Sequence, residues 1–258
     1  PGGHGHVDLE GSIRHSCDIY YYNMAERLGV QAIADMARQF GLGSRFDLPI
    51  PGQKAGLVPD PEWKRRVYGR SWLGGETLNM SIGQGSLLAT PLQLAVLAGR
   101  LATGKALVPR ILDDATVIPA LPLPIPKSHL DLVREGMVNV VNKVDGTAFK
   151  ARIRKEGQSM AGKSGTSQVR RISKAERETG VLDNDELAWR ERDHAIFIAY
   201  GPVIKPRYAV SVLVEHGGGG SSVAAPIVRD ILSAALDLDP MAKSKADVAV
   251  AADDVRKG

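Results

Sequence analysis

The sequence is short of cysteine, of aromatic residues and of long apolar runs, and each shortage narrows the class of protein. Cys17 is the single cysteine among 258 residues, so no disulfide can form within the chain. This fits the cytosol, or a periplasmic domain that needs no disulfide. No apolar stretch approaches the roughly 20 residues that cross a bilayer. With 43% hydrophobic and 5% aromatic residues, the composition is that of an ordinary globular domain.

Charge of one sign is also scarce. The formal net charge is +4, and the basic residues are scattered or interleaved with acids, as in residues 170–193. A nucleic-acid-binding surface needs basic residues gathered on one face or along one helix. The sequence therefore predicts a solvated surface and no nucleic-acid partner.

The amino-terminal residues lack the marks of a natural start. Residues 1–6 read Pro-Gly-Gly-His-Gly-His, with neither an initiator Met nor a signal peptide. We expect the sequence to be a segment of a longer protein.

The first half of the chain has helical patterns. Residues 1–11 are expected to be loop, and residues 106–112 resemble a short strand. Thr90-Pro91 is a helix start, because Thr caps free N–H groups and Pro fits the first helical position. Ser128, with Asp131 three residues later, predicts a second cap. Apolar spacing and Gly or Pro breaks predict helices over 16–28, 30–40, 60–68, from Pro91 to Gly104, and after Ser128.

The second half changes from helix to strand at residue 159. Residues 195–200 and 208–214 are rich in β-branched residues and joined by a Pro-containing turn, which predicts an antiparallel hairpin. An apolar helix over 223–236 is expected to cover the sheet, and 239–258 to be a disordered tail. The fold class is thus α+β, with a mainly helical part at 16–145 and a strand, hairpin and closing helix at 159–236, all within one domain at 1–238.

Residues 157–168 match two incompatible motifs. Gly157 to Ser164 satisfies the phosphate-binding P-loop pattern, whereas Lys163 to Thr166 spells Lys-Ser-Gly-Thr, a signature of penicillin-binding serine acyltransferases. A P-loop needs a buried strand before it and a helix starting at its lysine. Residues 149–156 are too charged for such a strand, and residues 164–169 are poor helix formers. The P-loop NTPase remains the weaker alternative.

Other short motifs accompany Lys163 to Thr166 in a specific order. They are Ser16-Cys17-Asp18, Gly83-Gln84-Gly85 with the Ala89 to Gln93 stretch, and Gly146-Thr147-Ala148. With these motifs the chain resembles the transpeptidase domain of class B penicillin-binding proteins, most closely those of the cell-elongation machinery. The resemblance covers residues 3 to about 236 and implies the penicillin-binding, serine β-lactamase-like fold in truncated form. It also implies that a helix and two strands of the family's five-stranded sheet lie upstream.

The resemblance implies the roles of six residues. Lys163 attracts the substrate's terminal carboxylate, the hydroxyls of Ser164 and Thr166 bind it, and Gly165 lets the substrate backbone lie close. The Thr166 N–H is expected to be an oxyanion donor. Ser16 would pass a proton to the leaving amine, and Asp18 would orient Ser16. From the residues alone, the Ser16 and Asp18 pair could equally be a helix cap.

The sequence departs from the family pattern in one motif. Ser-x-x-Lys, which supplies the nucleophile, follows none of its serines. We expect it upstream of residue 1, so the present segment alone should be inactive and should not be acylated by penicillin. A non-catalytic penicillin-binding-like module stays open as an alternative, as does a β-lactamase or carboxypeptidase of the same fold.

The resemblance also implies partners and location. They are peptidoglycan stem peptides ending in D-Ala-D-Ala, β-lactams, and a membrane-embedded glycosyltransferase of the elongation machinery. The domain would face the periplasm from an inner-membrane anchor outside this sequence, without a cofactor. A truncated sheet would leave an open edge that could pair with a second copy. Separately, His4, His6 and Asp8 are spaced so that an extended segment could hold a metal, although a solvated loop is the favoured interpretation.

Overall fold

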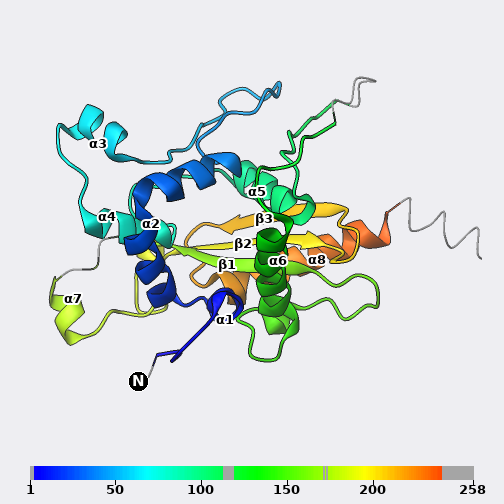
Figure 1. The fold of residues 1–258 in the computed structure, drawn as a ribbon. Helices are drawn as coiled ribbons and strands as arrows, with labels where there is room; N and C mark the ends of the chain where they lie inside the picture. The colour runs from blue at the N-terminus through cyan, green and yellow to red at the C-terminus, as the bar shows by residue number, and fades with distance from the viewer. Residues whose placement is uncertain (1–2, 113–118, 171, 173, 240–258) are drawn as a thin grey trace, which may run out of the picture.

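The computed structural model describes residues 3–112, 119–170, 172 and 174–239. Figure 1 shows the path of the chain through a helical part and then a sheet. The helices before the sheet are α1 (Leu9–Arg14), α2 (Asp18–Gln39), α3 (Pro61–Tyr68), α4 (Gly74–Ser81), α5 (Pro91–Thr103), α6 (Lys127–Asn142) and the 3-10 turn η1 (Phe149–Ala151). After them come β1 (Ala161–Ser167), α7 (Lys174–Thr179), η2 (Trp189–Glu191), β2 (His194–Gly201), β3 (Tyr208–Val214), η3 (Gly220–Ala224) and α8 (Ala225–Asp237).

Several helix boundaries follow from local chemistry and confirm the sequence predictions. At α5 the Thr90 hydroxyl accepts the Gln93 N–H at 3.2 Å, while the Gln93 side chain accepts the Thr90 N–H at 3.0 Å. This reciprocal pair satisfies two free donors of the helix start. Gly104 ends α5 with φ of 71°, a left-handed conformation that glycine adopts without strain. Gly29, with φ of 75°, kinks α2 where the sequence predicted a break.

Other predictions in the helical part are wrong. Residues 9–14 form α1, which Asp8 caps by accepting the Gly11 N–H, so the expected amino-terminal loop ends at residue 8. Residues 106–112 form no strand, and the pairing that the described residues show nearby is one isolated bridge between Lys105 and Pro122. Ser128 is not a cap, since α6 begins one residue earlier, at Lys127. Helices α4 and α7 were not predicted, and the predicted tail falls outside the described residues from 240 onward.

The three strands form an antiparallel sheet in the order β1-β2-β3. Lys163 pairs with Ile198, and Phe197 pairs with Val212, in the registers that join β1 to β2 and β2 to β3. The predicted hairpin is confirmed as β2 and β3. The predicted closing helix is confirmed as α8, which a turn of π-helix, η3, precedes.

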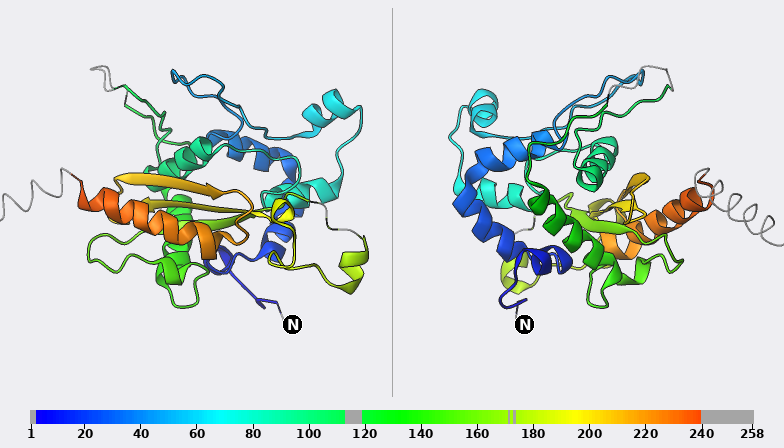
Figure 2. Two further views of the ribbon diagram at one scale, coloured as in Figure 1. Left: turned by 180° about the vertical axis from the view of Figure 1, so that it is seen from behind. Right: turned by 45° about the vertical axis from the view of Figure 1, so that its right-hand side comes forward.

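Helices cover both faces of the sheet. α6 packs on β1 and α5 on β2 and β3, while α8 packs on β2 and β3 from the opposite side. The view from behind in Figure 2 shows α8 lying over the strands. The observed layers are the helical part, the sheet and the closing helix that the fold class predicted.

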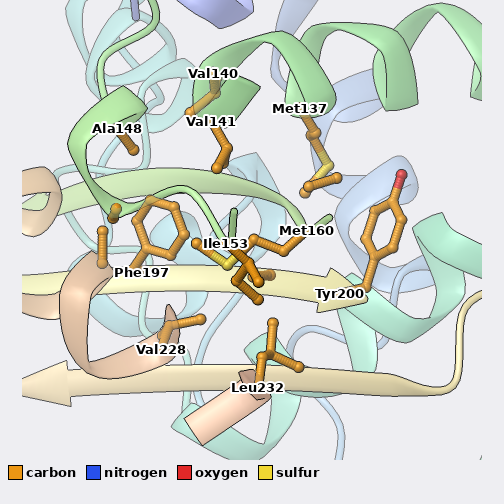
Figure 3. Close-up of a cluster of buried hydrophobic side chains, with 14 of the residues drawn as sticks. Met137, Val140, Val141, Ala148, Ile153, Met160, Phe197, Tyr200, Val228 and Leu232 are labelled. Carbon is orange, nitrogen blue, oxygen red and sulfur yellow. The ribbon is translucent and has the colours of Figure 1, made fainter. Parts of the chain in front are cut away.

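The main core lies between α6, the sheet and α8, as Figure 3 shows. Fully buried side chains fill it, among them Val140, Val141, Met160, Phe197, Val228 and Leu232. Burial of each such side chain contributes about 1.5–3 kcal/mol. Gly162 is required here, because a Cβ at that position would lie 2.4 Å from the Phe197 ring. The core therefore fixes the strand on which Lys163 stands.

A second, smaller core lies in the helical part, between α2 and α4. Five buried residues form it, from the carboxy-terminal half of α2, the loops that follow and α4: Val30, Ala34, Leu42, Val58 and Met80. It anchors α4 and the turn after it against α2.

None of the helices in the described ranges combines the length and the apolar character that a membrane crossing requires.

Candidate active site

Lys163 joins the two motifs that the sequence placed 147 residues apart. Its side chain leaves the middle of β1, and Nζ donates to Ser16 Oγ at 2.9 Å and to the Ser164 carbonyl at 3.0 Å. The carbonyl of Ser164 can only accept, so the amine supplies that proton. The structure thus brings Ser16, Lys163 and Ser164 together.

The segment between α1 and α2 presents Ser16. Ser16 has φ of 54°, a left-handed conformation that is uncommon for residues other than glycine. On its carboxyl side, the Cys17 N–H donates to the carbonyl of Ser12 at 2.9 Å, and both of these residues are buried. The helix begins at Asp18, two residues after the predicted start, so Ser16 precedes α2 and its exposed hydroxyl faces Lys163.

Burial tunes the lysine. It lowers the pKa of Lys163 from 10.5 to about 8, and the negative charge of Asp18 acts in the opposite direction. An amine with a pKa near 8 is partly neutral close to physiological pH. Lys163 can therefore both accept and donate a proton in exchange with the Ser16 hydroxyl.

These groups line a cleft of about 870 Å³ between the helical part and β1. Its walls include Ser16, Asp18, Asn79, Gln84, Lys163 and Thr166. All six predicted site residues, including Ser164 and Gly165, contribute to the lining. A cleft of this size accommodates a short peptide or a drug-sized molecule.

Gly165 is not demanded by the protein's own packing. A Cβ there would meet Ile196 at 3.5 Å, an ordinary contact. The contrast with Gly162, where a Cβ would enter the Phe197 ring, is sharp. The structure therefore places Gly165 on the cleft wall without requiring a glycine there for packing.

Gln84 is a cleft residue for which the sequence predicted no role. Its Nε2 donates to the Thr166 carbonyl at 2.8 Å and so links the turn after α4 to β1. Gly83 and Gly85 both have φ of 80°, and a residue flanked by two such glycines is the signal that could have drawn attention to it.

Among its described residues, the structure does not show the geometry that a P-loop or an amino-terminal metal site requires. Lys163 lies inside a strand, whereas a P-loop lysine opens a helix. Asp8 caps α1 and His4 stacks on His15, with ring centroids 5.5 Å apart. Throughout the described part of the chain, no three or more His, Cys, Asp or Glu side chains gather as a metal site would require.

The comparisons with known proteins agree on one family. The family model described as "Penicillin binding protein transpeptidase domain" matches residues 1–233. The peptidoglycan D,D-transpeptidase MrdA of Haemophilus influenzae is 35% identical over 242 residues, which are 89% of this chain and 36% of that protein. The protein of the same name from Acinetobacter baumannii is 34% identical, over 87% of this chain and 34% of that protein. The chain thus spans about a third of the length of these relatives.

Solved structures give the same picture. The penicillin-binding protein PBP2 of Helicobacter pylori, in a complex with MreC, matches with a TM-score of 0.80 and 32% identity, over 91% of this chain and 41% of that chain. PBP2 of Pseudomonas aeruginosa matches with a TM-score of 0.74 and 35% identity, over 91% of this chain and 50% of that chain. The described layers are therefore those of the penicillin-binding transpeptidase fold.

Proposed function

The chain belongs to the penicillin-binding protein transpeptidase family, and from that premise we propose that it forms one wall of the active site of a peptidoglycan D,D-transpeptidase. The observation that carries the proposal is the contact between Lys163 Nζ and Ser16 Oγ at 2.9 Å. It places a partly neutral amine and a hydroxyl side by side on an open cleft, the arrangement that proton transfer to a leaving amine needs.

The proposed reaction is serine acyl transfer on stem peptides that end in D-Ala-D-Ala. A serine attacks the penultimate D-alanine carbonyl, the terminal D-alanine leaves as an amine, and the amine of a second stem peptide then displaces the serine and forms the crosslink. The Ser-x-x-Lys motif of the family is not among these 258 residues. The nucleophile would therefore come from a segment outside them, and these residues alone would not be acylated.

Each residue of the wall has a part in this reaction. Ser16 delivers a proton to the departing amine, and Lys163 replenishes it. Asp18 sustains the charged form of Lys163, since its carboxylate raises the pKa of the amine. The ammonium of Lys163 and the hydroxyls of Ser164 and Thr166 bind the terminal carboxylate, while the Thr166 N–H stabilises the oxyanion.

The same reasoning extends to ligands, partners and location. β-Lactams would bind in place of the dipeptide. The resemblance to a structure titled "Structural coordination of polymerization and crosslinking by a peptidoglycan synthase complex" supports assembly with a polymerising partner, and the partner that we propose is a membrane-embedded glycosyltransferase of the elongation machinery. Such a protein would act in the periplasm, anchored in the inner membrane by a segment outside these residues.

Acylation by a fluorescent penicillin tests the proposal. The protein to use carries this chain behind a Ser-x-x-Lys segment, either its own or one grafted from the Haemophilus relative. We expect covalent labelling that Lys163→Ala and Ser16→Ala reduce by about 10²-fold or more. Lys155→Ala is the matched control, because Lys155 is an exposed lysine paired with Asp237. Labelling that survives Lys163→Ala unchanged would refute the assignment, as would labelling of the 258-residue chain alone.

We also propose that the free edge of β3 associates with a second copy of the chain. Within the described residues β3 pairs with β2 on one side and with no strand on the other, and such an edge is a template for pairing. Sedimentation of the 258-residue chain should show a dimer that dissociates on dilution. A monomer at every concentration would contradict this proposal and leave the catalytic one untouched.

A further inference from the structure

The cleft edge of β1 presents backbone groups to whatever enters the cleft. In an antiparallel strand the N–H and C=O of one residue point to the same side, and residues two apart share that side. The Ser164 carbonyl accepts from Lys163 Nζ and the Thr166 carbonyl accepts from Gln84 Nε2. Both carbonyls therefore face away from β2, and the Thr166 N–H lies on the same edge.

Gln84 donates a hydrogen bond to the Thr166 carbonyl from the other side of the cleft. Its backbone is held by the turn after α4, where its N–H donates to the Asn79 carbonyl at 2.9 Å. The flanking glycines are exposed, and a Cβ at Gly83 would meet nothing within 4 Å. Gln84 thus stands on an exposed turn that lines the cleft of about 870 Å³.

We propose that Gln84 is a gate on the substrate edge of β1. Its side-chain amide stands in for the backbone N–H of a peptide, and an extended peptide must displace it to pair with Thr166. Addition of a peptide strand to an exposed sheet edge is a recurring mode of recognition, and it uses main-chain hydrogen bonds of this kind. While the cleft is empty, the Gln84 amide also covers an edge that could otherwise pair with an unrelated strand.

That the ligand is a peptide rests on the proposed function. The gate adds that this peptide competes with the Gln84 side chain for the Thr166 carbonyl. Binding of the peptide replaces the Gln84 hydrogen bond on the Thr166 carbonyl with a hydrogen bond from the peptide. In the wild-type chain, the loss of the first bond therefore offsets part of the binding free energy that the second contributes. A neutral hydrogen bond of this kind changes an equilibrium by about two- to tenfold. Removal of the Gln84 donor should therefore strengthen peptide binding by that factor, whereas loss of a purely structural contact would weaken it.

The experiment measures non-covalent binding to the 258-residue chain by NMR titration of the Thr166 amide. The probe is diacetyl-L-Lys-D-Ala-D-Ala. Gln84→Ala and Gln84→Met both remove the donor, and Met preserves the length of the side chain. Gln31→Ala is the matched control, because Gln31 is an exposed glutamine on α2 that bonds Asp35 and lies outside the cleft. Thermal unfolding of each variant verifies that it is folded.

We expect both Gln84 variants to bind the probe about two- to tenfold more tightly than the wild type, and Gln31→Ala to bind equally. Binding by all four proteins with no gain in either Gln84 variant would overturn the gate and leave the proposed function standing. No binding by any of them would overturn the peptide site itself, and the gate with it.

Discussion

Because the pKa of Lys163 is lowered in the folded state, the free energy of unfolding should change with pH in the alkaline range. Replacement of Lys163 should remove this contribution. The folded-state pKa of about 8 lies below the ordinary value of 10.5 that the unfolded chain regains. Between these values the unfolded chain binds more protons than the folded one, so the free energy of unfolding rises with pH. Below about pH 8 the buried ammonium carries its full cost.

The magnitude follows from the two titration curves. The difference in bound protons between the unfolded and folded chains, integrated from about pH 8 to pH 10, is roughly 1.6 pH units. At about 1.36 kcal/mol per pH unit, the free energy of unfolding rises by up to about 2 kcal/mol over this range. Tyr200 acts with the opposite sign and mainly above about pH 10, because burial raises its pKa from 10.0 to about 12. Since Tyr200 is present in the wild type and in the variant alike, its contribution cancels in the difference between them.

The assay is urea unfolding of the wild type and Lys163→Met at several values between about pH 7 and pH 10, at constant ionic strength. We expect the wild type to gain up to about 2 kcal/mol relative to the variant across this range. In Asp18→Asn the pKa of Lys163 should fall further, because the carboxylate that favours the ammonium is gone. Parallel stability curves for the wild type and Lys163→Met would refute the account of a buried, weakly basic lysine.

Two further predictions compare pairs of positions by urea unfolding. Gly162→Ala should cost at least about 1–3 kcal/mol, because its Cβ would enter the Phe197 ring, whereas Gly165→Ala should cost little; equal losses would contradict the assigned packing. Thr90→Ala should cost about 1 kcal/mol by removing the α5 cap, and Ser128→Ala should be close to neutral because α6 starts before it; a loss at Ser128 as large as at Thr90 would count against these helix boundaries.

Local signals predicted the elements whose boundaries depend on local chemistry. Thr90 with Pro91 begins α5, Gly104 ends it, and Gly29 interrupts α2, because capping and left-handed backbone are decided within a few residues. The β2–β3 hairpin was equally visible from its β-branched runs and the Pro-rich turn.

Elements that depend on contacts with distant parts of the chain were not predicted correctly. Residues 106–112 have strand composition, yet Val108, Ile111 and Leu112 are exposed, and the described residues include no strand beside them. β-Propensity describes a side chain's fit to a half-buried surface, so without a partner strand it produces no strand. Helix α4 depends on contacts with α2, which no local pattern near residue 74 announces.

For the candidate site, the sequence supplied the members but not their geometry. Order and spacing of short motifs indicated Ser16, Asp18 and Lys163, yet the 2.9 Å contact between Ser16 and Lys163 depends on how α1, α2 and β1 pack. Gln84 stood inside a recognised motif, and only its bond to Thr166 gives it a role.

The central claim is that this chain supplies the transpeptidase wall of a peptidoglycan-crosslinking site. Mass spectrometry of the products from a D-Ala-D-Ala stem pentapeptide and an acceptor amine tests it most directly, with the protein that carries a Ser-x-x-Lys segment ahead of these residues. We expect release of D-alanine and a product in which the acceptor amine is joined to the shortened peptide, both lost in Lys163→Ala. Release of D-alanine with hydrolysis alone would indicate a carboxypeptidase, and no release at all from a folded protein would contradict the claim.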